Sequence, residues 1–137
     1  MRINLFIVRR RYFMIKPVII DDNKALAIVL RGAQESNYNL YEVVWDLNTQ
    51  FSTAPLSEKY RAATAAIHEL FVRGWIHFFK EHRDVDGNSQ YEDFAPENID
   101  TFLANPVTWY PYNGDVQIGI ESTSAGEQAY RSVDGVV

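Results

Sequence analysis

The most constraining feature of the sequence is a long helical stripe that is followed at once by a strand-like run. Between residues 57 and 73, apolar side chains recur at helical spacing, at Tyr60, Ala63, Ile67, Leu70 and Phe71. Ser57 stands where an N-cap is expected, and Gly74 is a natural stop for the helix. The bulky residues from Trp75 to Phe79 then favour a strand. We therefore expect an α+β fold in which helices pack on a sheet.

A first helix is expected upstream of this stripe. Residues 21–23 offer an N-cap, and apolar residues follow at helical spacing as far as Gly32, which would end the helix. A hairpin is the alternative, with strands at 17–20 and 25–30, because the β-branched residues of this region would suit strands equally well. The sequence leaves both structures open.

A second, shorter helix is expected over residues 39–47. Asn39 and Glu42 are three residues apart and match the pattern of a capping box, in which each side chain bonds the backbone beside the other. The next residues, 48–55, have the composition of a turn and separate this helix from the long stripe.

The C-terminal half is expected to hold the second strand of a pair. Residues 116–120 alternate apolar with small or polar side chains, so they could pair with the strand at 75–79. Between the two we expect a polar loop at 84–90 and a helix over 96–103. Residues 122–124 could cap a last helix over 126–131.

Length and composition limit the class of protein. The 137 residues suit one domain, and the absence of cysteine excludes disulfides, thiol catalysis and thiolate metal sites. No apolar stretch approaches the roughly 20 residues that a membrane-spanning helix needs. We therefore expect a soluble, cytoplasmic protein that has no contact with membranes and is held together by packing.

Charge is segregated along the chain. The net charge is −5, but residues 1–16 carry five basic side chains and no acidic one. Residues 84–130 carry nine acidic side chains and neither lysine nor arginine. Met14 could be a second start, so we expect residues 1–13 to be a basic arm or a start-site artefact and residues 14–137 to be the domain. An acidic C-terminal third favours a basic partner.

The order of the expected elements resembles that of a winged helix-turn-helix domain. Residues 70–79, LFVRGWIHFF, resemble the end of the third helix and the entry to the first wing strand of that superfamily, and residues 116–130 resemble the returning strand and the helix after it. The resemblance implies a winged-helix-like core of three helices with a two-to-three-stranded antiparallel sheet. It departs from the superfamily in a long insertion, residues 84–115, between the wing strands.

The resemblance also implies a DNA-binding alternative, in which helix 57–73 reads the major groove. The side chains that would contact DNA are cationic or polar and face outward in that interpretation: Lys59, Arg61 and His68 on the helix, with Lys80 and Arg83 on the wing. Acidic residues follow Arg83 at once, and phosphate contacts are electrostatic, so we expect nucleic acid to be the less favoured partner.

One short motif resembles a calcium loop, but only in part. Asp84, Asp86 and Asn88 stand at positions 1, 3 and 5 of such a loop. Ser89 stands where the turn needs glycine, and Ala95 stands where a bidentate glutamate should be. We therefore expect a solvated turn instead of a metal site.

No catalytic or cofactor motif is present. The sequence lacks a glycine-rich phosphate loop, a GxSxG elbow and an HExxH helix. His77 and His82 would lie on opposite faces of one strand, which argues against a shared metal ion. We expect a protein that is not an enzyme and that binds neither a metal ion nor a cofactor.

The aromatic residues near the end of the insertion suggest protein binding. Trp109 suits an ordinary core position, but it stands with Tyr110 and Tyr112 in a segment that can hardly bury all three rings. The expected partner surface combines acidic and aromatic side chains: Asp84, Asp86, Tyr91, Glu92, Asp93, Trp109, Tyr110 and Tyr112. By its size, acidity and lack of cysteine, the chain resembles bacterial immunity or antitoxin proteins, which implies inhibition of a basic toxin or nuclease.

Overall fold

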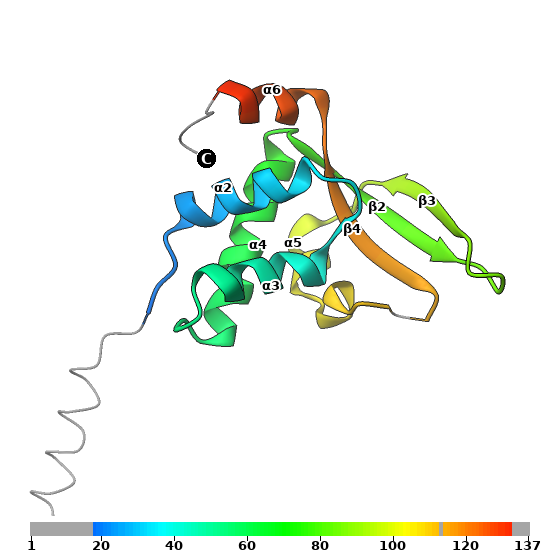
Figure 1. The fold of residues 1–137 in the computed structure, drawn as a ribbon, viewed down its shortest axis with the longest axis horizontal. Helices are drawn as coiled ribbons and strands as arrows, with labels where there is room; N and C mark the ends of the chain where they lie inside the picture. The colour runs from blue at the N-terminus through cyan, green and yellow to red at the C-terminus, as the bar shows by residue number, and fades with distance from the viewer. Residues whose placement is uncertain (1–17, 113, 133–137) are drawn as a thin grey trace, which may run out of the picture.

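The computed structural model describes residues 18–112 and 114–132. Residues 1–13, the expected basic arm or start-site artefact, lie outside the described residues. The described residues form an α+β fold of five α-helices and a four-stranded antiparallel sheet (Figure 1). None of these helices has the length and apolar character that a membrane span requires.

The first described helix is α2, Asp22–Ala33. The carboxylate of Asp21 accepts a hydrogen bond of 2.8 Å from the backbone N–H of Asn23, so the predicted cap and helix are confirmed and the hairpin alternative is wrong. Gly32 does not end the helix as predicted. A Cβ atom at Gly32 would lie 2.3 Å from the ring of Tyr38, so this glycine permits a close approach between the helix and the sheet.

A short strand and a helix follow, β1 (Tyr38–Asn39) and α3 (Leu40–Gln50). The predicted second helix is confirmed, but its capping box is not formed. The Asn39 side-chain amide donates to the carboxylate of Glu42 at 2.9 Å, and neither side chain bonds the backbone at the helix start. β1 was not predicted, because two residues carry no alternating pattern.

The long helix is α4, Leu56–Val72. It was predicted at nearly these bounds, but it begins after Pro55, and no side-chain hydrogen bond caps it, so the role assigned to Ser57 is wrong. Its buried face consists of small and aliphatic side chains together with one lysine, namely Lys59, Ala62, Ala63, Ala66, Ile67 and Leu70. Small side chains on this face let α4 lie close to α2 and α3.

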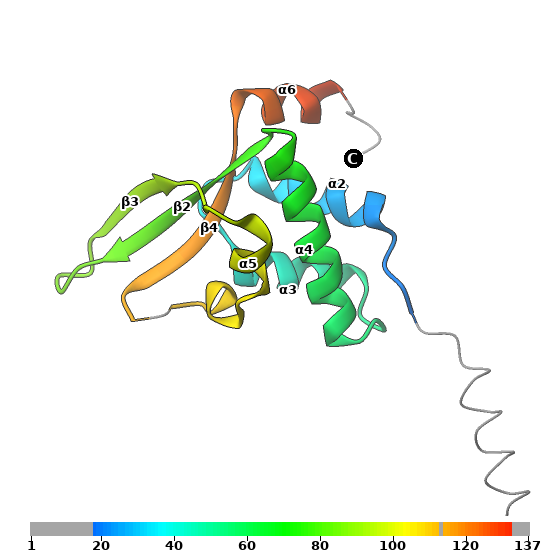
Figure 2. The same ribbon diagram turned by 180° about the vertical axis from the view of Figure 1, so that it is seen from behind.

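The strands after α4 are β2 (Ile76–Arg83), β3 (Ser89–Phe94) and β4 (Val116–Ser122). The strand order is β1-β4-β2-β3, so the predicted pairing of β2 with β4 is confirmed. The predicted two or three strands become four, because β1 pairs with β4 and because β3 forms within the segment that we expected to be a loop and an insertion. The turn between β2 and β3 extends away from the helices (Figures 1 and 2).

The rest of the insertion is also folded. It forms α5 (Ile99–Ala104), where helix 96–103 was predicted, and a 3₁₀ helix η1 (Pro106–Trp109). The carboxamide oxygen of Asn98 caps α5 by accepting from the N–H of Thr101 at 3.0 Å, which explains its later start. The last helix, α6 (Ser124–Ser132), confirms the predicted one and contacts α2.

Four phenylalanine rings join the insertion to the core. Phe78 on β2 is fully buried, and its ring centroid lies 5.2 Å from that of Phe71 on α4 and 5.2 Å from that of Phe102 on α5. Phe94 on β3 lies 5.9 Å from Phe78 and 5.5 Å from Phe102. This phenylalanine cluster therefore holds α4, α5 and β3 against β2.

We predict that Phe78→Ala lowers the free energy of unfolding by about 3–5 kcal/mol, because it leaves a cavity where three rings meet. Val85→Ala is the control, since Val85 is fully exposed at the hairpin turn and should change stability by less than about 0.5 kcal/mol. Chemical denaturation followed by circular dichroism measures both. A Phe78 variant as stable as the Val85 variant would contradict this role.

Candidate functional site

The acidic loop at 84–88 is the turn of the β2–β3 hairpin. The carboxylate of Asp84 accepts hydrogen bonds of 2.9 Å from the backbone N–H groups of Asp86 and Asn88. Gly87 has φ +81°, which glycine adopts without strain. Asp84 thus shapes the turn, and no group of three metal-ligating side chains exists among the described residues.

Five of the predicted partner residues gather on this hairpin, and all five are exposed: Asp84, Asp86, Tyr91, Glu92 and Asp93. They lie on two faces of it. Glu92 shares a face with His82, whose Nε2 is 3.1 Å from its carboxylate. Tyr91 and Asp93 lie on the opposite face, where the Tyr91 ring packs edge-on against Phe79 with a centroid distance of 5.7 Å.

The two histidines of β2 also lie on opposite faces, as their spacing predicts. His77 has its Nε2 3.6 Å from a carboxylate oxygen of Asp93 and 3.6 Å from one of Glu121. His82 contacts Glu92 instead. Each histidine therefore lies beside a carboxylate of a neighbouring strand, and the side chains of Asp93 and Glu92 remain exposed.

Tyr112 joins the hairpin from the far end of the insertion. Its hydroxyl accepts a hydrogen bond of 2.6 Å from the guanidinium of Arg83, which also lies 4.6 Å from the ring centroid. The hydroxyl faces the carboxylate of Glu81 at 3.4 Å. Partial burial and the charge of Glu81 raise the pKa of Tyr112, so the phenol stays protonated and can donate to this carboxylate.

Trp109 and Tyr110 lie elsewhere, so the predicted surface is divided. Trp109 is 5% exposed and its indole N–H donates to the carbonyl of Leu103 at 2.9 Å. It therefore belongs to the core, and our inclusion of it among the exposed partner contacts is wrong. Tyr110 is half exposed and, together with the edge of Trp109, lines a groove.

This groove runs along α4, between α2 on one side and α5 with η1 on the other. Its volume is about 980 Å³. Its larger apolar lining residues are Leu26, Tyr60, Leu103, Pro106, Trp109 and Tyr110. No sequence pattern indicates this groove, because one of its walls exists only when α5 and η1 fold back onto α4. The rings of Tyr60 and Trp109 make an edge contact there, with a centroid distance of 5.5 Å.

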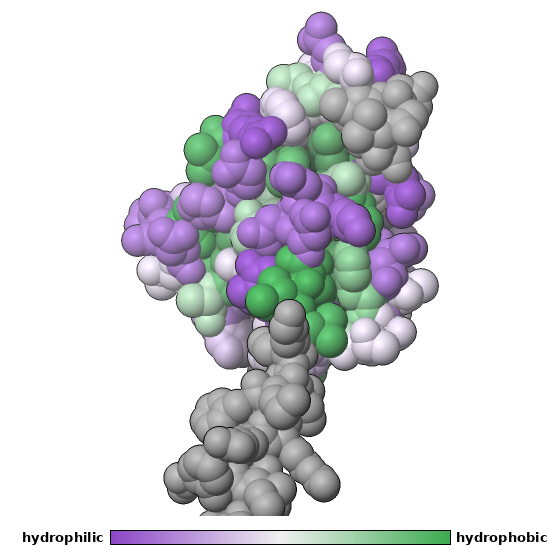
Figure 3. All heavy atoms as spheres, turned by 90° about the vertical axis from the view of Figure 1, so that its left-hand side faces the viewer, coloured by the Kyte–Doolittle hydropathy of each residue, from purple (hydrophilic) through white to green (hydrophobic). Residues whose placement is uncertain are grey.

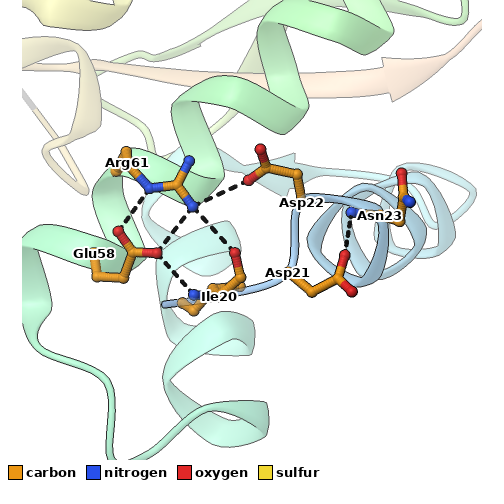
Figure 4. A network of polar contacts seen from close by, with 6 residues as sticks. All are labelled: Ile20, Asp21, Asp22, Asn23, Glu58 and Arg61. Carbon is orange, nitrogen blue, oxygen red and sulfur yellow. Dashed lines mark hydrogen bonds and ion pairs between the residues drawn. The ribbon is translucent and has the colours of Figure 1, made fainter. Parts of the chain in front are cut away.

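Arg61 lies at the rim of the groove and anchors the start of α2 (Figure 4). Its guanidinium contacts Asp22 at 3.0 Å, Glu58 at 2.6 Å and the backbone carbonyl of Ile20 at 3.1 Å. The other oxygen of Glu58 accepts from the N–H of Ile20 at 2.7 Å. The hydrogen bond from Arg61 is the main cause that lowers the pKa of Glu58, and the bond from the N–H of Ile20 adds to it. The carboxylates of Glu58 and Asp22 in turn raise the pKa of Arg61.

This end of the molecule is mostly hydrophilic, with hydrophobic side chains gathered where the described chain begins (Figure 3). Val18 and Ile19 are exposed there, while Ile20 is buried. The two backbone bonds to Ile20 therefore fix the first described residues against α4 just before α2 begins.

The five candidate DNA contacts are all engaged within the protein. Lys59 was expected to point outward, but it is 5% exposed because it lies on the buried face of α4, where it donates to Asn48. Arg61 and Arg83 have the partners given above. Of the other two, His68 lies 3.4 Å from Asp100, and the Lys80 ammonium sits 4.7 Å from the ring centroid of Phe94.

A scan against protein-family models, a search of curated proteins and a search of solved structures gave no match for this chain. We therefore infer function from the charges and geometry of the described residues.

We predict that Glu58→Gln lowers the free energy of unfolding at neutral pH by about 1–2 kcal/mol, because it removes the charge that Arg61 and Ile20 contact. Since folding lowers the pKa of Glu58, its contribution is present above the pKa of the unfolded chain and is lost as the pH falls through the lowered value. Denaturation from neutral to acidic pH measures this dependence.

Glu69→Gln is the matched control for this prediction. Glu69 also pairs with an arginine, Arg73, at 2.7 Å, but both side chains are half exposed and four residues apart on α4. This variant should change stability by less than about 0.5 kcal/mol. Equal losses in the two variants would show that the Glu58 network has no special role.

Proposed function

We propose that this protein is a non-enzymatic protein-binding domain whose β2–β3 hairpin recognises a cationic protein. One observation carries the proposal: four carboxylates, those of Asp84, Asp86, Glu92 and Asp93, are exposed on a single hairpin whose turn extends away from the helices (Figure 1). Such a projecting set of like charges attracts a partner of opposite charge over distances comparable with the Debye length, about 8 Å at physiological ionic strength.

The balance of charge over the described residues supports a cationic partner. They carry eight lysines and arginines against seventeen aspartates and glutamates, a net charge of −9. Several of the basic side chains are held by partners within the fold, namely Lys59, Arg61, Arg73, Lys80 and Arg83. The hairpin carboxylates contact no lysine or arginine in the described part of the chain, so their charge remains available for association.

Two tyrosines give the hairpin apolar contact area. Tyr91 is 51% exposed and Tyr112 is 37% exposed, and each is held by a neighbour, Phe79 and Arg83 respectively. Tyrosines that are already ordered lose little conformational entropy on binding and are frequent interface hot spots. We infer that Tyr91 and Tyr112 contribute affinity, while the carboxylates contribute association rate and specificity.

The specific form of the proposal is an inhibitor of the immunity or antitoxin type. A nuclease holds the phosphates of its substrate in a basic groove, and a projecting acidic hairpin can occupy such a groove. A basic toxin or nuclease is therefore the partner that best fits the charge and shape of the hairpin.

We further propose that the fold is a winged-helix variant. The order α2, β1, α3, α4, β2 and β4 fits that architecture, with β3, α5 and η1 as the insertion. This order favours a second candidate function, a transcription regulator that reads DNA with α4. The ion pairs of Arg61 and the burial of Lys59 weigh against it, as do the walls of the groove along α4.

We predict that reversing Asp86, Glu92 and Asp93 to lysine abolishes capture of the partner from native cells and slows its association at low salt at least about tenfold. Asp84 is left unchanged because it shapes the turn. The control variant reverses Glu35, Glu97 and Glu127, three exposed acids outside the hairpin. Both variants have the same net charge, so only the position of the reversed charges differs.

Each capture is divided into nuclease-treated and untreated halves, and protein and nucleic acid are identified in both. A basic protein retained equally in both halves by the wild type and the control variant, and lost by the hairpin variant, is the expected result. DNA in the untreated half without a stoichiometric protein would favour the regulator instead. In that case Arg61→Ala should lower the slope of the logarithm of the DNA-binding constant against the logarithm of the salt concentration by about one.

A further inference from the structure

We infer that the outer edge of β3 accepts an extended, basic segment of the partner as an additional strand of the sheet. This inference rests on the proposed function and specifies how the hairpin binds. β3 is the last strand in the order β1-β4-β2-β3, and among the described residues no strand pairs with its outer edge. Residues 89–93 are all exposed.

The hydrogen bonds of the hairpin show which backbone groups face outward. The N–H of Asp84 donates to the carbonyl of Asn88 at 2.9 Å, so these two residues form a pair joined by one backbone hydrogen bond, while the N–H of Asn88 donates to the Asp84 carboxylate. Such pairs alternate along an antiparallel ladder, which places the N–H and C=O groups of Gln90 and Glu92 toward β2. Those of Ser89, Tyr91 and Asp93 therefore point away from the sheet.

A second bond confirms this alternation. The N–H of Arg83 donates to the carbonyl of Asp115 at 3.0 Å, so the odd-numbered residues of β2 bond toward β4 and its even-numbered residues bond toward β3. Within the described parts of the chain, the edge of β3 thus offers three residues with unpaired donors and acceptors. Gly87, with φ +81°, lies in the turn and outside residues 89–94, which pair with β2 in unbroken register.

The charges on the edge select its occupant. Proteins commonly protect a sheet edge with charged side chains, and here the charges at Glu92 and Asp93 are both negative, with Asp84 and Asp86 in the adjoining turn. A second copy of β3 would bring carboxylates against carboxylates, which disfavours self-pairing. A basic strand meets the opposite sign, so the same charges that protect the edge would favour this partner.

Both faces of the added strand would find contacts. On one face lie the Tyr91 ring and the Asp93 carboxylate, and on the other lies the Glu92 carboxylate. The partner segment is therefore one in which lysine or arginine alternates with β-branched residues, because such a segment is both extended and basic. Backbone bonds would supply affinity, and the alternating side chains would supply specificity.

The test measures amide hydrogen exchange by NMR on the full chain, with and without a capped eight-residue peptide that alternates lysine and threonine. Strand addition should slow exchange at Tyr91 and Asp93 at least about tenfold, because their N–H groups become bonded. Exchange at Gln90 and Glu92, already bonded to β2, should change far less. Equal slowing at all four residues, or slowing at none, would overturn the inference.

A chemically matched peptide separates strand pairing from charge. N-methylation of alternate residues along the edge that faces β3 removes donors but keeps every positive charge, and it should weaken binding at least about tenfold. If both peptides bind equally, strand addition is overturned, while the acidic hairpin of the proposed function stands. If neither peptide binds and the capture experiment still depends on the hairpin charges, strand addition alone has failed.

Two variants at one position complete the test. Asp93→Pro removes an outward N–H, which an edge strand tolerates, whereas Asp93→Asn removes only the charge. In the proline variant, the peptide should no longer slow amide exchange at Tyr91. In the asparagine variant, the peptide should still slow it, but at a higher peptide concentration, because one negative charge is missing. Retained signals of the phenylalanine cluster show that the fold persists. A dimer with protected Tyr91 and Asp93 amides before peptide is added would identify a second copy as the occupant and overturn the inference.

Discussion

The fold depends on the contact of Phe78 with three other phenylalanine rings. Phe78 comes from the central part of the sheet, while Phe71, Phe94 and Phe102 come from α4, β3 and α5. Without this shared core the segment between β2 and β4 would be a long connection without stable structure. On their own, its elements would be unstable, because α5 has only six residues and β3 is almost wholly exposed. Apolar packing thus lets the insertion form one side of the groove, with α5 and η1, and the edge strand β3.

The side of the groove formed by α5 and η1 limits what α4 can contact. Its outward face lies at the bottom of the groove, flanked by Leu26 of α2 and by Leu103 and Trp109 of the insertion. A helix so enclosed is poorly placed to enter a DNA groove, and the acids around it hold its arginines. The same insertion that closes this face presents a new one at the hairpin. In the proposed function, the recognition surface is therefore the sheet edge and not α4.

Sequence patterns identified the elements whose signals are local. The stripe of α4 and the alternation of β4 were sufficient to predict these two elements. The clustering of acidic residues in the sequence also indicated side chains that lie on the β2–β3 hairpin. β3, with the sequence SQYEDF, escaped prediction because it has no apolar alternation and is stabilised by pairing with β2. The burial of Lys59 and the groove could not be predicted, since both depend on the packing of segments distant in sequence.

The distribution of charge explains how a stable fold can have an unpaired strand edge among its described residues. Arg61 lies against carboxylates of α2 and α4, and Arg83 lies against the ring of Tyr112, so these two cations stabilise the body of the protein. The acids of the hairpin lie where water can solvate them, and they cost little to expose. Because like charges repel at an unpaired strand edge, these acids hinder self-association in the absence of a partner. A cationic partner of the proposed kind would remove that repulsion, so in this proposal the same carboxylates protect the edge and select its occupant.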